Sequence, residues 1–151
     1  DTPEKEALTR KLFEDKCEIF TVQAISPLQN SVDYSTIKDK YNQTMYCDSA
    51  LKDVLVCPQP FYSMQLMAHG SVRPCCMLEA ECYDLGNIKE ESIYDIWNGE
   101  KLKVLQKIHL QGNRNKINAC KNCNYPKYLD NVYDNLDENR SEILKKCYKK
   151  S

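Results

Sequence analysis

The clearest structural signal in this sequence lies in residues 57–75, which read CPQPFYSMQLMAHGSVRPC. Residues 61–68 and 71–73 flank the pair His69 and Gly70. A glycine in such a pair can adopt the positive φ that a tight turn requires. The stretch therefore predicts a β-hairpin.

Two pairs of cysteines are associated with this hairpin and with the helical region that follows it. Cys57 and Cys75 bracket the first hairpin strand and its turn, while Cys120 and Cys123 form a C-x-x-C loop. The two-residue spacing lets two thiolates point into one site, and Pro74 gives the second hairpin cysteine a rigid setting. Four thiolates suit a 4Fe-4S cluster or a tetrahedral zinc ion, and ligand softness does not choose between them.

The number of cysteines and the net charge indicate which classes of protein and which partners are compatible with this sequence. The chain has nine cysteines, an odd number, and it opens with DTPEKE, which is unlike a signal peptide and suggests a piece of a longer chain. We therefore expect metal binding in a reducing cytoplasm rather than a secreted disulfide scaffold. A net charge of -1 provides no field that would attract nucleic acid or an anionic membrane. No apolar run approaches the ~20 residues that span a bilayer, so we expect a soluble protein with neither partner.

The first third of the sequence predicts a helix, a strand and a connection. Thr2 can cap a helix that begins at Pro3, and apolar residues at helical spacing continue it over residues 3–16. Residues 18–25 are rich in β-branched and aromatic residues, which predicts a strand. Residues 28–50 are polar with little periodicity, which predicts an extended connection and a boundary near residue 50.

Helical signals dominate after the hairpin. Ser92 lies three residues before an acid, which predicts a short helix from residue 93. Residues 101–110 carry an apolar face that ends just before Gly112, which predicts a second helix. A third helix is expected over residues 141–149.

The cysteines stand within a longer series of motifs. In chain order these are Cys57-Pro58-Gln59-Pro60-Phe61, His69-Gly70-Ser71-Val72-Arg73-Pro74-Cys75-Cys76, Leu85-Gly86-Asn87-Ile88, Ser92-Ile93-Tyr94-Asp95-Ile96-Trp97 and Cys120-Lys121-Asn122-Cys123. The series resembles the SPASM or twitch domain of radical S-adenosylmethionine (SAM) enzymes. The resemblance covers residues 55–125, with Cys57, Gly70 and Cys75 matching its core pattern.

This resemblance implies an α+β fold, in which a small β-hairpin and helices surround a cysteine-ligated cluster. Residues 1–50 would be the end of a preceding radical SAM barrel domain and its connection, a helix-strand remnant. Residues 51–126 would be the SPASM/twitch domain, and residues 127–151 a C-terminal helical tail.

The implied cofactor is an auxiliary 4Fe-4S cluster held by Cys57, Cys75, Cys120 and Cys123. It would support electron transfer or substrate positioning during radical-based modification of a peptide, sugar or small molecule. The implied partner is the radical SAM barrel domain of the same polypeptide, which would bind the SAM. The alternative is a non-catalytic zinc-binding structural or interaction module, and recombinant protein could also carry zinc.

Two departures from the family pattern affect the predicted number of clusters and the predicted activity of the chain. Residues 124–146 contain no cysteine, whereas a full SPASM domain has further cysteines after its C-x-x-C, so the single-cluster form is predicted. The chain also lacks C-x3-C-x2-C, the motif that binds SAM in this superfamily. Alone, the chain is therefore expected to be inactive as a radical enzyme.

The remaining cysteines receive simpler interpretations. Cys76 points away from its neighbour along a strand, so a packed thiol is expected. Cys147 is expected to be a thiol on a helix face, with metal ligation as the alternative, and the role of Cys82 stays open. Cys17 and Cys47 are expected to be structural.

Four other side chains receive structural interpretations. His69 at the hairpin turn and His109 near a helix end are expected to be surface or capping groups. Trp97 is expected in the core and Arg73 on a solvent-facing strand.

Overall fold

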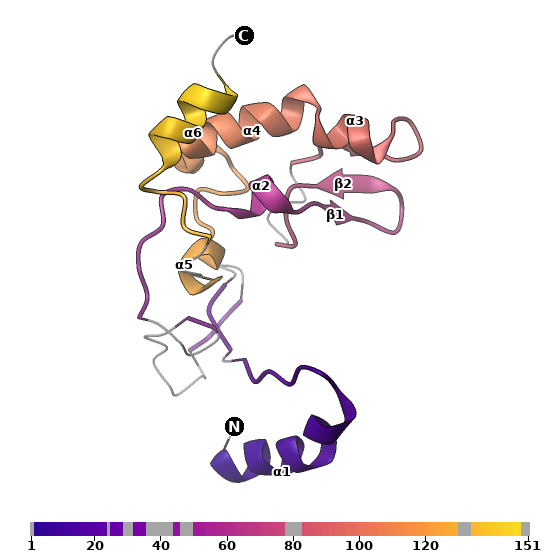
Figure 1. Ribbon diagram of the computed structural model, residues 1–151, viewed down its shortest axis with the longest axis vertical. Coiled ribbons are helices and arrows are strands. Elements are labelled where there is room, and N and C mark those ends of the chain that lie inside the picture. Colours follow the sequence, from indigo (N-terminus) through magenta and orange to yellow (C-terminus); the bar gives the residue numbers. More distant parts are fainter. Residues whose placement is uncertain are drawn as a thin grey trace.

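The structure is a computed structural model that describes residues 2–23, 25–28, 32–35, 44–45, 50–77, 83–129 and 134–148 (Figure 1). It has short helices and a small sheet, so the α+β fold class is confirmed. In chain order the elements are α1 (Pro3–Phe13), the 3-10 helix η1 (Glu14–Lys16), α2 (Gln59–Tyr62), β1 (Gln65–Leu66), β2 (Ser71–Arg73), β3 (Gly86–Asn87), α3 (Ile93–Trp97), α4 (Glu100–Leu110), the 3-10 helix η3 (Arg114–Lys116), α5 (Tyr125–Leu129) and α6 (Arg140–Cys147).

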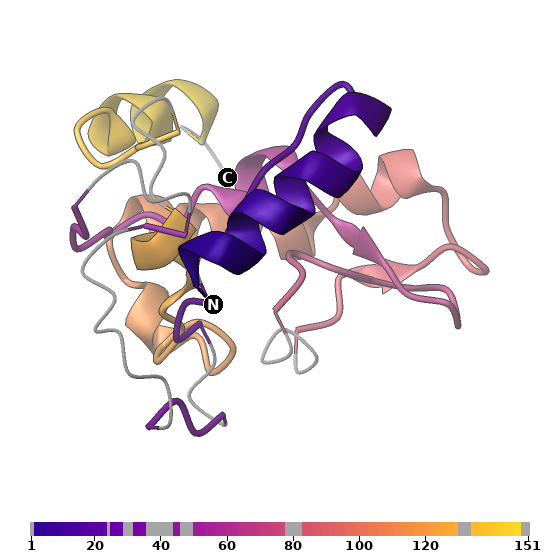
Figure 2. The ribbon, with the colours of Figure 1, turned by 90° about the horizontal axis from the view of Figure 1, so that it is seen from below.

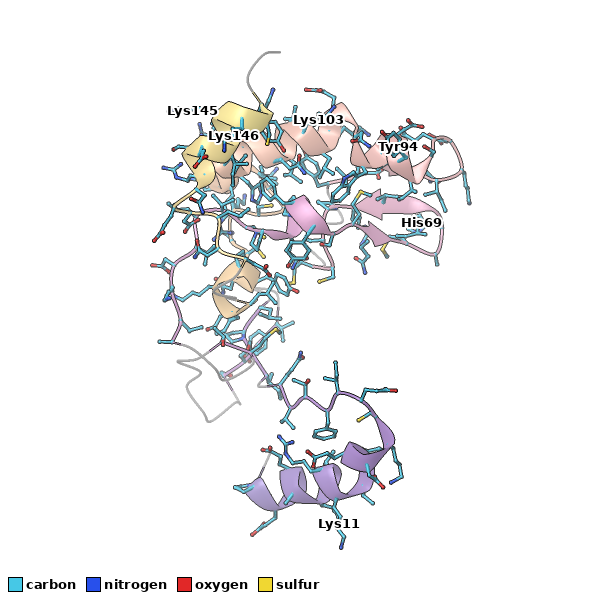
Figure 3. The ribbon with its side chains drawn as sticks, viewed as in Figure 1. Lys11, His69, Tyr94, Lys103, Lys145 and Lys146 are labelled. Atoms are coloured by element: carbon cyan, nitrogen blue, oxygen red, sulfur yellow. The ribbon has the colours of Figure 1, made fainter. Side chains whose placement is uncertain are left out.

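The sheet is antiparallel with the order β1-β2-β3. The expected hairpin is confirmed, with Leu66 opposite Val72. Gly70 has a φ of 100°, and a Cβ atom there would lie 2.6 Å from Oδ1 of Asn87. The positive φ therefore favours glycine at this turn. Figure 3 places His69 at the exposed tip of the hairpin, as expected.

The helices after the sheet follow their local sequence signals. Ser92 accepts a hydrogen bond from the backbone N–H of Asp95 at 3.1 Å, and α3 begins at the next residue. The longer helix α4 ends at Leu110, and Gly112 follows with a φ of 74°. The predicted tail helix is also present as α6, although it ends at Cys147.

One apolar core joins the sheet to α3 and α4. Its buried members come from β2, from the segments before β3 and after η3, and from the two helices, and they are Val72, Leu85, Ile96, Leu102, Leu105, Ile117 and Ala119. Trp97 and Cys120 pack against this core from the side, so the expectation for Trp97 is confirmed. Figures 1 and 2 show α6 and the hairpin toward opposite ends of α4, which makes α4 the central element.

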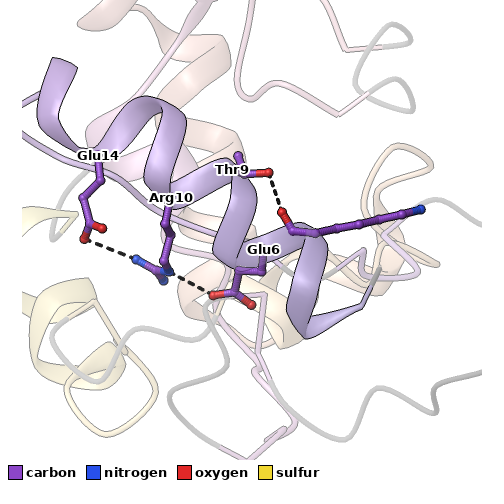
Figure 4. A network of polar contacts seen from close by, with 5 residues as sticks. Glu6, Thr9, Arg10 and Glu14 are labelled. Carbon is purple, nitrogen blue, oxygen red and sulfur yellow. Dashed lines mark hydrogen bonds and ion pairs between the residues drawn. The ribbon is translucent and has the colours of Figure 1, made fainter.

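The helix α1 and the 3-10 turn after it span residues 3–16, as predicted. Thr2 accepts a hydrogen bond from the backbone N–H of Lys5 at its start. Arg10 lies between Glu6 and Glu14 at 3.1 and 3.6 Å, and these exposed ion pairs (Figure 4) contribute little stability. No residue of α1 is buried, and Figure 1 shows the helix at the far end of the long axis from α4.

Two expectations about the elements are wrong. The described part of residues 18–25 contains no strand, and Ile19 is 82% exposed. A single segment with strand-forming residues needs a neighbour to pair with, and none lies beside it in the described residues. Phe61 and Tyr62 end the helix α2 instead of beginning the hairpin. Most of the connection expected over residues 28–50 lies outside the described residues.

In the part of the chain that the structure describes, no helix is long and apolar enough to cross a bilayer.

Candidate metal centre

The four predicted cysteine ligands line one cavity. Cys57 lies just before α2, Cys75 just after β2, and Cys120 and Cys123 in the loop between η3 and α5. Each of the two cysteine pairs therefore contributes to the lining of the same cavity. The rest of the lining is mainly apolar, with side chains from α4 and from the loops around the cysteines.

A carboxylate from the C-terminal segment fixes the main chain that leads to Cys57. Asp137 accepts hydrogen bonds from the backbone N–H groups of Leu55, at 3.0 Å, and Val56, at 2.8 Å. Val56 is fully buried, so its N–H would otherwise be removed from water without a partner. This contact spans about 80 residues of sequence and gave no local signal that could have revealed it.

The side chain of Arg114 stabilises the C-x-x-C loop through hydrogen bonds to its main chain. Nη1 of Arg114 donates to the carbonyl oxygens of Cys120, at 2.9 Å, and Cys123, at 3.1 Å. The loop is tightened further because the N–H of Cys123 donates to the carbonyl of Cys120. Arg114 also lines the cavity, so it brings a positive charge close to the sulfur atoms. No local sequence signal marked Arg114 as part of the site.

The electrostatics of the cavity favour the neutral form of the Cys57 thiol. Burial raises the pKa of the Cys57 thiol well above its usual range, and a hydrogen bond from the backbone N–H of Gln59 partly opposes this. The sulfur atoms of Cys75, Cys123 and Cys120 raise the same pKa further. Four thiolates close together in an apolar wall therefore need the positive charge of a metal centre to remain deprotonated.

His109 was expected at the surface or as a helix cap, and this expectation is wrong. The residue is 1% exposed and lines the same cavity as the four cysteines. It shares a face of α4 with Leu102 and Leu105, at helical spacing, which is the signal that could have placed it inside. Burial, and secondarily the charge of Arg114, lowers its pKa to about 4, so the ring is neutral at neutral pH.

The expectations for the remaining cysteines have mixed outcomes. Cys76 is exposed, so the prediction of a packed thiol is wrong: its neighbour Cys75 faces the cavity, and Cys76 faces solvent. Cys147 is an exposed thiol on α6, as predicted, and Cys17 is exposed as well. Cys47 and Cys82 lie outside the described residues.

The donor set fits an iron-sulfur cluster, because four cysteine thiols surround a cavity that also contains an unpaired buried imidazole. Within the described residues, no three His, Cys, Asp or Glu side chains converge closely enough to enclose a single metal ion.

Comparison with known families agrees with this geometry. Residues 57–124 match the SPASM family, described as an iron-sulfur cluster-binding domain. The match begins at the first cysteine of the cavity and ends one residue after the last. The predicted resemblance to the SPASM domain of radical SAM enzymes is therefore confirmed.

The chain is also similar to a named enzyme, the S-adenosyl-L-methionine-dependent 2-deoxy-scyllo-inosamine dehydrogenase of Niallia circulans. The two are 35% identical over 75 residues, which make up 50% of this chain and 30% of that protein. The matched segment thus spans less than a third of the relative. No solved structure matches the chain.

Proposed function

We propose that this chain is the auxiliary-cluster portion of a radical SAM enzyme, and that Cys57, Cys75, Cys120 and Cys123 hold one 4Fe-4S cluster. The observation that carries the proposal is the shared cavity: the four cysteines of the SPASM match all line it. Cys76, although adjacent in sequence, faces solvent and is not part of the ligand set. A single cluster follows because residues 124–146 offer no further cysteine.

The residues of the cavity suit this role in two ways. Apolar side chains such as Met77 and Ala119 exclude water from the sulfur atoms, which protects a centre of this kind and influences its potential. Arg114 adds a positive charge that favours the thiolate forms of the cysteines. When bound, the cluster supplies a one-electron redox centre, or a site that positions substrate.

For the intact polypeptide we propose a SAM-dependent oxidoreductase that modifies a peptide, sugar or small molecule. Support comes from the relative, which by its name depends on SAM and oxidises 2-deoxy-scyllo-inosamine. SAM would bind in a barrel domain of the same polypeptide. Residues 1–50 would be its end and connection, residues 51–126 the SPASM/twitch domain, and residues 127–151 a helical tail.

We place this enzyme in the cytoplasm, where a reducing environment keeps thiols free. In support, the exposed Cys17, Cys76 and Cys147 are free thiols.

The proposal is tested by measuring iron, sulfide and zinc in protein reconstituted without oxygen. We expect about four irons and four sulfides per chain, together with the broad visible absorption of a cluster. The double variant Cys120→Ser, Cys123→Ser should lose both. The matched control is Cys76→Ser, which removes an exposed thiol next to a ligand and should retain the full cluster.

Two results would contradict the proposal. One tightly bound zinc that iron cannot replace would support the zinc-binding structural or interaction module. Equal iron loss in the Cys76→Ser variant and the double variant would show that the shared cavity does not define the ligands.

A further inference from the structure

One buried side chain of the cavity has no partner within the described residues. His109 lies in the last turn of α4, is 1% exposed and lines the cavity with the four cysteines. Neither Nδ1 nor Nε2 of its ring has a hydrogen-bond partner among the described residues. The other buried polar side chain of the same helix, Gln106, has a partner at both polar atoms: its Nε2 donates to the carbonyl of Pro60 and its Oε1 accepts from Tyr148.

An unpaired imidazole of this kind is costly to bury. A buried donor or acceptor without a partner costs about 1–3 kcal/mol, and native proteins contain few of them. An apolar residue of similar size would fill the same space in α4 without that cost. The polar ring is therefore best explained by a partner that arrives in the cavity.

We propose that His109 donates a hydrogen bond from its ring N–H to the bound cluster, at a bridging sulfide or a cysteine sulfur, and so raises the midpoint potential of the cluster. The proposal rests on the cluster-binding function and adds a positioning and tuning residue to it. The chemistry is complementary because sulfides and thiolates are hydrogen-bond acceptors, and each such bond stabilises the more negative, reduced state.

The surroundings of His109 are consistent with a donor of this type. With its pKa lowered to about 4, the ring is neutral at neutral pH and carries one N–H. The Nη1 atom of Arg114, which lines the same cavity, donates to the carbonyl oxygens of Cys120 and Cys123. The four thiols complete the ligand set of a 4Fe-4S cluster, which leaves the imidazole outside the metal coordination.

The test compares three variants with the wild-type chain, all reconstituted without oxygen. His109→Leu removes the donor at similar volume, and His109→Gln keeps a donor. His69→Asn is the matched control, because it changes the other histidine of the chain, which is exposed at the hairpin tip. Iron and sulfide content and the midpoint potential, by redox titration monitored with electron paramagnetic resonance, are measured for each.

We expect equal iron content in all four proteins and a lower potential in His109→Leu alone. At a fixed applied potential the ratio of oxidised to reduced cluster should rise about tenfold, which is about 59 mV for a one-electron couple. His109→Gln should recover part of the shift. An unchanged potential in a fully loaded His109→Leu protein overturns the proposal. Loss of iron from that variant, with full retention in the double cysteine variant, also overturns it, because His109 would then be a ligand.

A second measurement does not depend on the folding of the His109 variants. In His69→Asn protein labelled with ¹⁵N-histidine, His109 is the only labelled residue. Pulsed electron paramagnetic resonance of the reduced cluster should then show a weak ¹⁵N coupling, as expected through a hydrogen bond. No coupling, or the strong coupling of a directly bound nitrogen, contradicts the proposal. If the wild-type protein takes up no iron at all, the proposed cluster-binding function is wrong. This result differs from a loaded cluster that shows no coupling to His109, which contradicts only the role of His109.

Discussion

Two charged side chains hold the backbone beside the cysteines. Asp137 accepts from the main chain just before Cys57, and Arg114 donates to the main chain of the C-x-x-C loop. Hydrogen bonds to charged groups contribute more than neutral ones, roughly 1.5–3 kcal/mol each. These two residues therefore position three of the four sulfur atoms without contacting metal themselves.

Replacing Asp137 by alanine should destabilise the folded chain. The buried N–H of Val56 would lose its acceptor, at a cost of about 1–3 kcal/mol. Urea unfolding followed by the fluorescence of Trp97, the single tryptophan, measures the change. Glu138→Ala is the control, because Glu138 is exposed and adjacent. Equal midpoints for the two variants would show that the Asp137 contact is not important for the fold.

Replacing Arg114 by alanine should release the C-x-x-C loop. We expect iron to be lost to a chelator on the order of tenfold faster, because about 1.4 kcal/mol of loop stabilisation corresponds to that factor. The rate is read from the decay of the visible absorption. Lys116→Ala removes an exposed cation from the same 3-10 turn and should leave the rate unchanged. A similar acceleration in both variants would indicate a general effect of charge.

The helix α4 connects the core, the cavity and the C-terminal segment. Leu102 and Leu105 pack into the core, and Leu105 also lines the cavity. Gln106 joins α2 to α6 through its contacts with Pro60, at 2.8 Å, and Tyr148, at 2.5 Å. Because one rigid helix makes all these contacts, damage to its core face should reach the metal site.

The variant Leu102→Ala tests this role of α4. Leu102 is fully buried but does not line the cavity, so its truncation should cost about 2–5 kcal/mol of unfolding free energy. Val104→Ala, on the exposed side of the helix, should change stability by less than about 0.5 kcal/mol. Calorimetry of both variants provides the comparison. A loss below 1 kcal/mol for Leu102→Ala would show that α4 is not central to the fold.

Elements with strong local signals were predicted well, and those that depend on partners were not. The hairpin turn at Gly70, the capped start of α3 and the apolar face of α4 are encoded within a few residues. The two-residue strand β3 is defined by its pairing with β2, and α2 is a single turn. Neither has enough residues to show periodicity.

The whole molecule consists of a packed part around the cavity and an N-terminal helix with no buried residue. Contacts from earlier residues do reach the site region: the amide of Asn124 donates to the carbonyl of Pro27, and the N–H of Met45 donates to the carbonyl of Tyr128. In contrast, α1 exposes Leu8, Leu12 and Phe13. We therefore expect α1, but not the segment from Ser26 to Met45, to be dispensable for cluster binding.

Deleting residues 1–23 should leave iron content unchanged and alter the unfolding free energy by less than about 0.5 kcal/mol. Deleting residues 1–45 should reduce iron retention, because the contacts to Asn124 and Tyr128 are lost. Iron content after gel filtration checks both. Iron loss in the shorter deletion would show that α1 supports the site.

Local sequence was sufficient to group the four cysteines that line the cavity and to predict the hairpin that leads to Cys75 and the helix α4 that lies between the two cysteine pairs. These features depend on residue chemistry and spacing over a few positions. The burial of His109, the exposure of Cys76 and the contacts of Asp137 and Arg114 required the folded chain. They arise where segments distant in sequence pack together, and the burial, charge and hydrogen-bond partners of a side chain depend on what those segments place around it.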